Sequence, residues 1–505
     1  MKRTCIFLGI LLLINSWGVC LPDEIPLSDA TQECLDCHRN IHPGIVTDWQ
    51  QSRHAKQTVA AALKTSELLR RISNNNISEE LKANAVGCAE CHLSRPDEHS
   101  GTFEHNGHLV HVVVSPKDCA QCHSTEAEQY KNNVMSHAHG NLADNPVYQQ
   151  LQSAIIDRPS LNENGQLKLS PSLTSTQFET CYHCHGTRIT PVGLKTQETV
   201  LGEMKFPILE GWPNQGVGRI NTDGSKGSCS ACHSRHTFSI AMARKPDTCK
   251  QCHVGPDVPA TKVYEASKHG NIFAAMNGDW NFDTVPWTIG QDFTAPTCAA
   301  CHISLLVSRD GEVVSKRTHA MGDRLAHRLY GLIYSHAHPK EPETSKIRNQ
   351  DGLALPTTFK GVSAEQYLIS KQEAEQRKIN MLAACLNCHS STWVTSHFNR
   401  LETTITESNA TVKTATELME TIWQQKLARG LDQKANPFDE AIEKKWIKTW
   451  LFHANSIRFA AAMAGGGDYG VFADGRFQQA ANIAEMMDWL KLRTKKLACH
   501  QKMMS

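Results

Sequence analysis

The sequence of 505 residues has no excess of either charge and, beyond its first residues, no long apolar run. Its 52 Lys and Arg residues balance 51 Asp and Glu residues, so the formal net charge is +1. Binders of nucleic acids or of acidic surfaces carry a clustered basic excess, and the composition gives no support to either class. The charged fraction of 20% and the apolar fraction of 40% are typical of a folded protein and not of a disordered tail.

The one marked apolar run extends from Cys5 to Ile14 and follows a short basic start. About ten apolar residues are too few to cross a bilayer but suit the core of a secretion signal. We therefore expect a signal peptide at 1–20, cleavage near Leu21 and a soluble periplasmic mature chain without a membrane span. The alternative is a lipoprotein anchored at Cys20, which the preceding Val19 disfavours.

Cysteine and histidine are abundant, with 19 and 26 copies, and sixteen of the cysteines fall into eight copies of Cys-x-x-Cys-His. This is the attachment pattern of c-type haem, in which two thiols add to the haem vinyl groups and the adjacent histidine binds iron. Zinc sites pair one Cys-x-x-Cys with another and do not need the trailing histidine. The sequence therefore predicts eight covalently bound haem c groups. In chain order the motifs are Cys34/Cys37/His38, Cys88/Cys91/His92, Cys119/Cys122/His123, Cys181/Cys184/His185, Cys229/Cys232/His233, Cys249/Cys252/His253, Cys298/Cys301/His302 and Cys385/Cys388/His389.

One cysteine of the expected mature chain, Cys499, lies outside these motifs. A free thiol near a frayed C-terminus is the favoured interpretation. An intermolecular link, or a contact with a partner cytochrome, is the alternative.

The motifs recur at irregular intervals, which excludes a solenoid and suits a chain wrapped around a stack of cofactors. The haem groups would then supply much of the buried apolar surface. We predict a mainly α fold: a haem-packed region at 21–390 with little β structure, and a C-terminal helical bundle at 391–505. Helices are expected over 403–429, 438–463 and 476–498, and short hairpins around 109–114 and 303–307.

A haem iron with two histidine ligands can only pass electrons, whereas an iron that lacks the second ligand can bind a substrate. Eight histidines belong to the motifs, and the rest are too many to assign by counting. The function therefore depends on which haem lacks its second histidine.

From about residue 30 to 470, the chain resembles the octahaem hydroxylamine oxidoreductase family. The most specific block extends from the fifth to the seventh motif. It comprises Cys229-Ser-Ala-Cys-His-Ser-Arg-His236-Thr-Phe-Ser, Arg244-Lys-Pro, Asp257, Ser267-Lys-His269-Gly and Ala295-Pro-Thr-Cys-Ala-Ala-Cys-His302.

The resemblance implies seven electron-carrying haems with two histidine ligands each and an open, catalytic fourth haem on Cys181, Cys184 and His185. It also implies a set of distal iron ligands. These are His54, His137, His236, His269 and His319, with a less secure match for His108 or His111, and for His453 with His397 as its alternative.

Three departures bear on the direction of the reaction. In oxidative family members an Asp-His pair lies over the open haem; here Asp257 matches the Asp, but Val258 replaces the His. Oxidative members also bind a tyrosine of a neighbouring subunit covalently to the catalytic haem, and Tyr469 matches it only loosely. The interval between the fourth and fifth motifs, which contains 211–218, is much longer than in those enzymes and is expected to reshape the approach to the fourth haem.

Together these features favour reduction of nitrite, nitric oxide or hydroxylamine, with Asp257 helping to deliver protons. One alternative is oxidation of hydroxylamine or hydrazine with a cross-linked Tyr469, and another is pure electron transfer. The Cys-x-x-Cys-Lys motif of a second octahaem group does not occur. As partners the resemblance implies a small nitrogen substrate, a periplasmic cytochrome and further copies of the chain, as a homotrimer in contact through the C-terminal helices.

Overall fold

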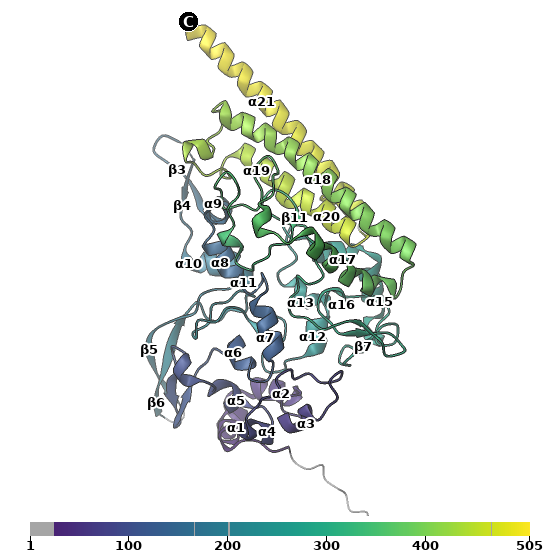
Figure 1. Ribbon diagram of the computed structural model, residues 1–505. Coiled ribbons are helices and arrows are strands. Elements are labelled where there is room, and N and C mark those ends of the chain that lie inside the picture. Colours follow the sequence, from purple (N-terminus) through teal and green to yellow (C-terminus); the bar gives the residue numbers. More distant parts are fainter. Residues whose placement is uncertain (1–24, 166, 200–201, 466, 505) are drawn as a thin grey trace, which may run out of the picture.

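The computed structural model describes residues 25–165, 167–199, 202–465 and 467–504, so the expected signal peptide at 1–20 lies outside the described residues. As predicted, the fold is mainly α (Figure 1). Short helices and loops form the larger part of the molecule, and long helices lie across one end. None of the helices in these ranges is long and apolar enough to cross a membrane.

The first 390 residues form mostly short helices, because the haem motifs divide the chain. The helices α5, α11 and α16 begin on the first cysteine of a motif and end on its histidine. One helical turn places residues i, i+3 and i+4 on one face, so both thiols and the imidazole are presented together. These helices are α1 Asp29–Ile41, α2 Pro43–Gln51, α3 Val59–Leu63, α4 Glu79–Ala83, α5 Cys88–His92, α6 Pro116–Cys119, α7 Ser124–Lys131, α8 Ala138–Ala143, α9 Pro146–Ile156, α10 Thr174–Glu179, α11 Cys181–His185, α12 Ile240–Arg244, α13 Pro246–Lys250, α14 Ala260–Ala266, α15 Lys268–Met276, α16 Cys298–His302 and α17 Lys371–Leu386.

The β structure consists of small antiparallel hairpins and one three-stranded sheet in which β7 and β8 are parallel. The hairpins expected around 109–114 and 303–307 correspond in part to β2 and β8. The small share of strand agrees with the predicted fold class, and the longest hairpin, β5–β6, lies in the interval between the fourth and fifth motifs. The strands are β1 Phe103–His105, β2 His108–Val110, β3 Arg158–Leu161, β4 Leu167–Ser170, β5 Thr190–Thr199, β6 Gly202–Glu210, β7 Trp287–Thr288, β8 Leu306–Val307, β9 Val313–Ser315, β10 His327–Arg328 and β11 His336–Ala337.

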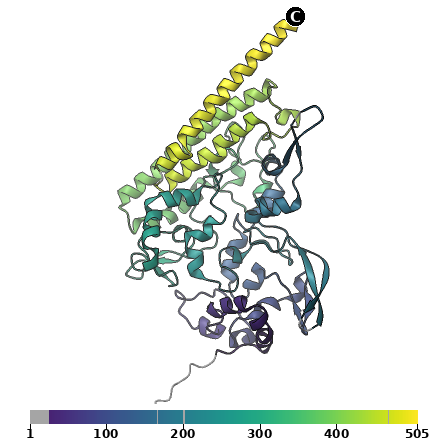
Figure 2. The same ribbon diagram turned by 180° about the vertical axis from the view of Figure 1, so that it is seen from behind.

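The C-terminal bundle contains α18 Ser391–Gln424, α19 Ala441–Ile447, α20 Ala454–Ala462 and α21 Arg476–Met504. The helix expected from 403 begins twelve residues earlier, where Ser390 caps α18 directly after the last haem motif. The helix expected over 438–463 is confirmed, except that the π-helix Lys448–His453 interrupts it between α19 and α20. From both sides, α21 extends past the end of its neighbours (Figures 1 and 2).

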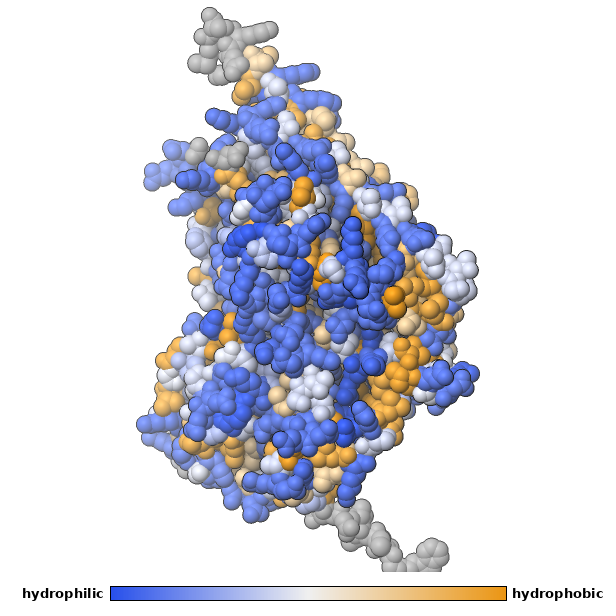
Figure 3. Space-filling view, viewed as in Figure 1, coloured by the Kyte–Doolittle hydropathy of each residue, from blue (hydrophilic) through white to orange (hydrophobic). Residues whose placement is uncertain are grey.

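The largest apolar core joins this bundle to the haem region. Trp446 and Trp450 are completely buried in it, together with residues of α9 such as Leu151 and of the loop around Ile333. Trp446 Nε1 also donates a hydrogen bond to Thr416 Oγ1 at 3.0 Å. The core therefore crosses the proposed boundary between 390 and 391. On the face seen in Figure 1, hydrophilic side chains predominate and apolar patches lie along the right-hand edge (Figure 3).

One carboxyl group in this core links fold stability to pH. Glu443 is completely buried, and burial raises its pKa from 4.5 to about 7, although Trp423 Nε1 and the Glu440 amide donate hydrogen bonds to it. The folded chain therefore holds a proton that the unfolded chain loses above its ordinary pKa. This contribution to stability is complete below pH 4.5 and is lost as the pH rises to about 7.

We predict that Glu443→Gln weakens the fall in melting temperature between pH 5 and pH 8. The matched control is Glu417→Gln, at an exposed position of α18 where the carboxylate lies 4.0 Å from Lys413. Thermal unfolding of the three holoproteins at both pH values checks this expectation. An identical pH dependence in wild type and Glu443→Gln would contradict it.

Candidate functional site

A cavity of about 1550 Å³ runs through the part of the chain that carries the haem motifs. Residues of seven motifs line it, and only the first motif contributes none. The cavity is lined largely by apolar surface and by the cysteines of the motifs, which suits a large apolar group held through paired thiols. Covalently attached haem has this chemistry.

The first motif differs from the expected arrangement of a chain wrapped around buried haems. Its residues Cys34, Cys37 and His38 lie on α1, are partly exposed and do not line the cavity. The reason is the place of α1 in the fold, since it lies at one end of the molecule and packs on the short helices α2 and α5 (Figure 1). For the thiol of Cys37, no hydrogen bond or charge contact occurs within the described ranges. Haem attachment at Cys37 therefore stays a prediction that rests on the spacing of the motif.

Thiols of different motifs lie close together, which shows how the motifs are arranged. Hydrogen bonds join four pairs, and in two of them the partner thiol helps to lower a pKa to about 7, at Cys34 and at Cys184. The pairs are Cys34–Cys88, Cys119–Cys229, Cys184–Cys252 and Cys249–Cys298.

Weaker electrostatic contacts extend this arrangement. They join Cys91 to Cys122, Cys232 to Cys249 and Cys301 to Cys385. The motifs thus follow one another in the order one, two, three, five, six, seven and eight, and the fourth lies beside the sixth.

Several motif histidines face a second histidine across a gap that suits an iron ion. Two imidazole rings that bind one metal from opposite sides, with metal–nitrogen distances of about 2.0 Å, have centroids about 6.2 Å apart. The matching pairs are His38–His105 at 6.2 Å, His123–His54 at 6.3 Å, His233–His319 at 6.3 Å and His389–His269 at 6.1 Å. His92 and His111 also lie 6.2 Å apart, but both ring nitrogens of His111 lie against backbone oxygens. His54, His269 and His319 are distal ligands expected from the sequence. In His105 and His319, one buried ring nitrogen has no hydrogen-bond partner among the described residues.

At the first motif, the structure brings His105 rather than His108 or His111 opposite His38. His108 Nε2 instead lies 2.8 Å from Glu33 Oε2. Both nitrogens of His111 are within hydrogen-bonding distance of backbone oxygens, and its ring stacks on His99 with 3.8 Å between centroids. A signal for His105 was present in the sequence: Asn106-Gly107 favours a two-residue hairpin turn, which pairs residue 105 with 108.

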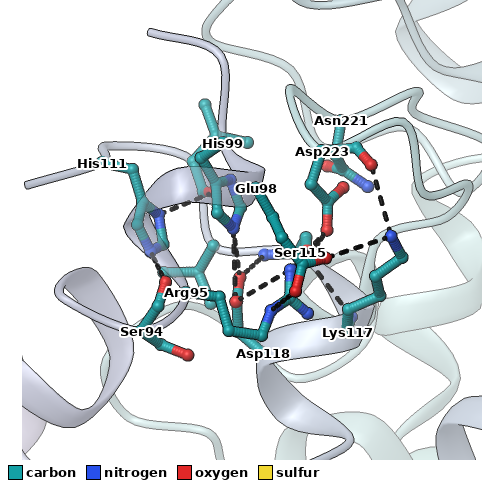
Figure 4. Close-up of polar contacts among 12 residues, drawn as sticks. Ser94, Arg95, Glu98, His99, His111, Ser115, Lys117, Asp118, Asn221 and Asp223 are labelled. Atoms are coloured by element: carbon teal, nitrogen blue, oxygen red, sulfur yellow. Dashed lines mark hydrogen bonds and ion pairs between the residues drawn. The ribbon is translucent and has the colours of Figure 1, made fainter. Parts of the chain in front are cut away.

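His111 belongs to a buried polar network between the second and third motifs (Figure 4). His99 Nε2 lies 3.2 Å from the carboxylate of Asp118, and Arg95 bonds Asp223 at 2.9 Å. The backbone of His111 holds the iron-binding histidine of the second motif: its amide donates to His92 O, and its carbonyl lies 2.8 Å from His92 Nδ1. Because these side chains satisfy one another, the network serves to position His92. His236, one of the expected distal ligands, is close enough to His92 for the two charges to interact.

Two other expected ligands, His137 and His453, are engaged outside the cavity. His137 Nε2 lies 2.9 Å from Lys131 O, and His453 Nδ1 lies 2.9 Å from Asp474 Oδ1. Three further histidines outside the motifs also line the cavity, His327, His338 and His397, as does His183 within the fourth motif. Of these, only His397 was considered from the sequence. No spacing pattern marks His327, in the two-residue strand β10, or His338, just after β11.

Polar side chains gather near His185 of the fourth motif. Asp257, Tyr148 and Arg328 line the cavity there. Burial lowers the pKa of His185, while Asp257 opposes this and Arg328 adds to it, so both charges lie near the ring. Among the described residues, no histidine faces His185, His253 or His302 at the iron-bridging separation. The fourth motif is therefore distinguished by its polar surroundings.

Tyr469 does not line this cavity. Its hydroxyl lies beside Ser456 and Asp474 of its own chain, and burial raises its pKa. Asp474 also accepts from Ser456 Oγ at 2.9 Å. Tyr469 thus lies in a polar cluster at the end of α20.

The long interval between the fourth and fifth motifs contacts the fourth motif and also His105, which faces the first motif. At one end, Phe206 of β6 packs against His105, with 6.1 Å between ring centroids. Its return segment packs on the fourth motif: Val217 N donates to Cys184 O at 3.0 Å. A side chain at Gly218 would come within 2.6 Å of His185 O, so this close approach requires glycine. The interval therefore buttresses the first and fourth motifs.

Known families match most of the haem region. Residues 215–325 match the family "Seven times multi-haem cytochrome CxxCH", and residues 32–113 and 118–205 match the family of cytochrome c554 and c-prime. A solved structure described as a hypothetical multiheme protein is 37% identical, with a TM-score of 0.87, over 94% of this chain and 97% of its own.

Two proteins of Kuenenia stuttgartiensis are also similar. One, described as "Probable nitrite reductase-hydroxylamine oxidoreductase fusion protein", is 25% identical over 418 residues. That match covers 80% of this chain but only 39% of the relative's length. The other is a chain of a reducing HAO-like protein complex, 16% identical with a TM-score of 0.61, over 94% of this chain and 87% of its own, and it shows likeness of fold. With the haem motifs and the geometry above, these matches show that the chain belongs to the hydroxylamine oxidoreductase-like family of multihaem c-type cytochromes, which bind haem c covalently.

Proposed function

We propose that the chain is an oxidoreductase that binds eight haem c groups and reduces a small nitrogen compound at the fourth. The observation that carries this proposal is the gathering of Asp257, Tyr148 and Arg328 around His185. The other seven motifs form a continuous series that suits electron transfer. The iron ligands in the motifs would be His38, His92, His123, His185, His233, His253, His302 and His389.

For the distal ligands we propose His54, His105, His236, His269 and His319. His105 replaces the expected His108 or His111, because it lies opposite His38. At the remaining closed haems, the cavity-lining His327, His338 and His397 compete with His137 and His453.

The open haem would supply the electrons and the site at which the nitrogen compound binds. Breaking the N–O bond of hydroxylamine takes up two electrons and two protons and yields ammonia and water. Asp257 supports the proton supply, since its carboxylate lies near His185 and its backbone is fixed by Asn455, whose Nδ2 donates to Asp257 O at 2.7 Å. Val258 provides no second titrating group.

The position of Tyr469 supports reduction over oxidation. A cross-link to the haem of another subunit would require its hydroxyl to leave Ser456 and Asp474. The Kuenenia relative whose description combines nitrite reductase and hydroxylamine oxidoreductase agrees with a nitrogen compound as substrate. Oxidation with a Tyr469 cross-link, and electron transfer alone, are the competing functions.

A periplasmic cytochrome is the proposed electron donor. The first motif, outside the central cavity, is one candidate for its docking site, and the eighth, with the exposed Cys388, is the other. We further propose export by the signal peptide at 1–20 and a homotrimer whose subunits meet through α18–α21.

Nitrite and hydroxylamine reduction by purified protein with reduced viologen, measured beside hydroxylamine oxidation with an artificial acceptor, tests the proposed function. We expect reduction to be faster. Asp257→Asn should slow it by about 10²–10⁴-fold, because a positioned proton donor is lost. Asp310→Asn, in an exposed turn, should retain the wild-type rate. Faster oxidation, or an unchanged rate in Asp257→Asn, would contradict the proposal.

Intact mass under denaturing conditions tests the role of Tyr469. We expect separate subunits, each carrying eight haem groups, because the hydroxyl of Tyr469 lies beside Ser456 and Asp474 of its own chain. Subunits that stay joined in wild type and separate in Tyr469→Phe would support the oxidative alternative.

Electron paramagnetic resonance tests the ligand at the first motif. We expect His105→Ala to convert one low-spin ferric haem to high spin, because its iron loses a histidine ligand. His108→Ala, three residues away on the same hairpin, should leave the spectrum unchanged. The reverse result would assign the ligand to His108.

A further inference from the structure

Arg328 occupies a fixed position in the wall of the cavity. It ends the two-residue strand β10, where it pairs with His336 of β11. Its side chain and those of Tyr148 and Tyr330 line the cavity. The guanidinium lies over the ring of Tyr330, 5.0 Å from its centroid, and interacts electrostatically with that residue.

Arg328 differs from Arg317 and Arg324, two other arginines of the cavity wall, in the partners of its guanidinium. Arg317 pairs with Glu126 at 2.7 Å, and Arg324 donates to four backbone oxygens. For Arg328 no ion pair with a carboxylate and no side-chain bond to a backbone oxygen occurs within the described ranges. A guanidinium has five N–H donors, and a buried charge without a counter-ion is costly. The cavity wall therefore offers a strong, incompletely used anion site.

The helix α20 ties Arg328 to the proposed catalytic residues. Arg458, completely buried, donates to Leu329 O at 3.2 Å and to Asn455 Oδ1 at 3.2 Å. Asn455 in turn donates to the backbone of Asp257. Two residues of α20, Asn455 and Arg458, thus hold the backbone of the segments that carry Asp257 and Arg328. The side chains of Asp257 and Arg328 take no part in these contacts. Such support from a rigid element preserves the spacing of a binding site.

Arg328, Tyr148 and Tyr330 together have the chemistry to recognise a small oxyanion. The planar guanidinium fork matches two oxygens of one anion, and phenol hydroxyls add further donors. Electrostatic contacts of Tyr148 with both Arg328 and Asp257 place these groups in one neighbourhood. Of the nitrogen compounds considered, nitrite is the anion, whereas nitric oxide and hydroxylamine are neutral near pH 7.

We propose that Arg328, with the hydroxyls of Tyr148 and Tyr330, forms an oxyanion subsite beside His185 that selects nitrite as the substrate. This inference rests on the proposed function, because it assumes that the fourth haem is open. A carboxylate of a bound haem is also an anion that Arg328 could pair with. The two possibilities differ in what loss of Arg328 does to the binding of a neutral ligand such as hydroxylamine. Loss of an arginine that pairs only with the haem would alter the binding of nitrite and hydroxylamine alike.

Spectroscopic titration of the ferric holoprotein with nitrite and with hydroxylamine tests the subsite. We expect Arg328→Gln to raise the Kd for nitrite about ten- to a hundredfold, as for loss of hydrogen bonds to a charged group, and to leave that for hydroxylamine within about twofold. Arg328→Lys, which keeps the charge but not the fork, should give a smaller rise. Arg309→Gln, at an exposed arginine, is the matched control.

An unchanged nitrite affinity in Arg328→Gln, or an equal loss for both ligands, would overturn the subsite and leave the proposed function intact. Wild-type protein that binds neither ligand would overturn both. If Arg328→Gln does not incorporate its haems, Arg328→Lys and Tyr330→Phe provide the same comparison, and equal nitrite affinity in both and in wild type would overturn the subsite.

Discussion

The structure depends on the filling of its interior. Side chains of seven motifs surround a cavity of about 1550 Å³ whose walls are largely apolar, and apolar surface is costly to leave in contact with water. Covalent attachment through paired thiols therefore completes the hydrophobic core as well as supplying the redox groups. The conventional apolar core is correspondingly concentrated at one end, around Trp446 and Trp450, where α18–α21 pack on α9 and on the loop near Ile333.

The sequence predicted those features that follow from local spacing. The Cys-x-x-Cys-His pattern located every motif, and apolar periodicity located the long C-terminal helices. Features that depend on contacts between residues far apart in the sequence could not be predicted from it. The spacing of Cys34 and Cys37 could not show that their motif lies outside the cavity that the other seven line. The Asn106-Gly107 turn predicts the hairpin that carries His105, but nothing in the local sequence identifies His105 as an iron ligand. His327 lies in the two-residue strand β10 and His338 just after β11, and elements this short have no periodic pattern.

The helix α20 shows how the C-terminal bundle contributes to the proposed catalytic centre. Its Asn455 and Arg458 hold backbone atoms of residues far away in the sequence, at Asp257 and Leu329. Subunit contacts through neighbouring helices would therefore act on the same element that spaces the cavity residues. In the proposed trimer, binding geometry and assembly would be connected through one helix.

The order of the motifs in space differs from their order in the chain. The fourth motif adjoins the sixth through Cys184 and Cys252, while the others form a continuous series from the first to the eighth. In the proposed enzyme the catalytic haem is thus a side branch, and the sixth haem is its junction. Electrons could reach the sixth haem from the first or from the eighth. The fourth haem would therefore receive electrons for the next step even when the haems at one end of the series are oxidised.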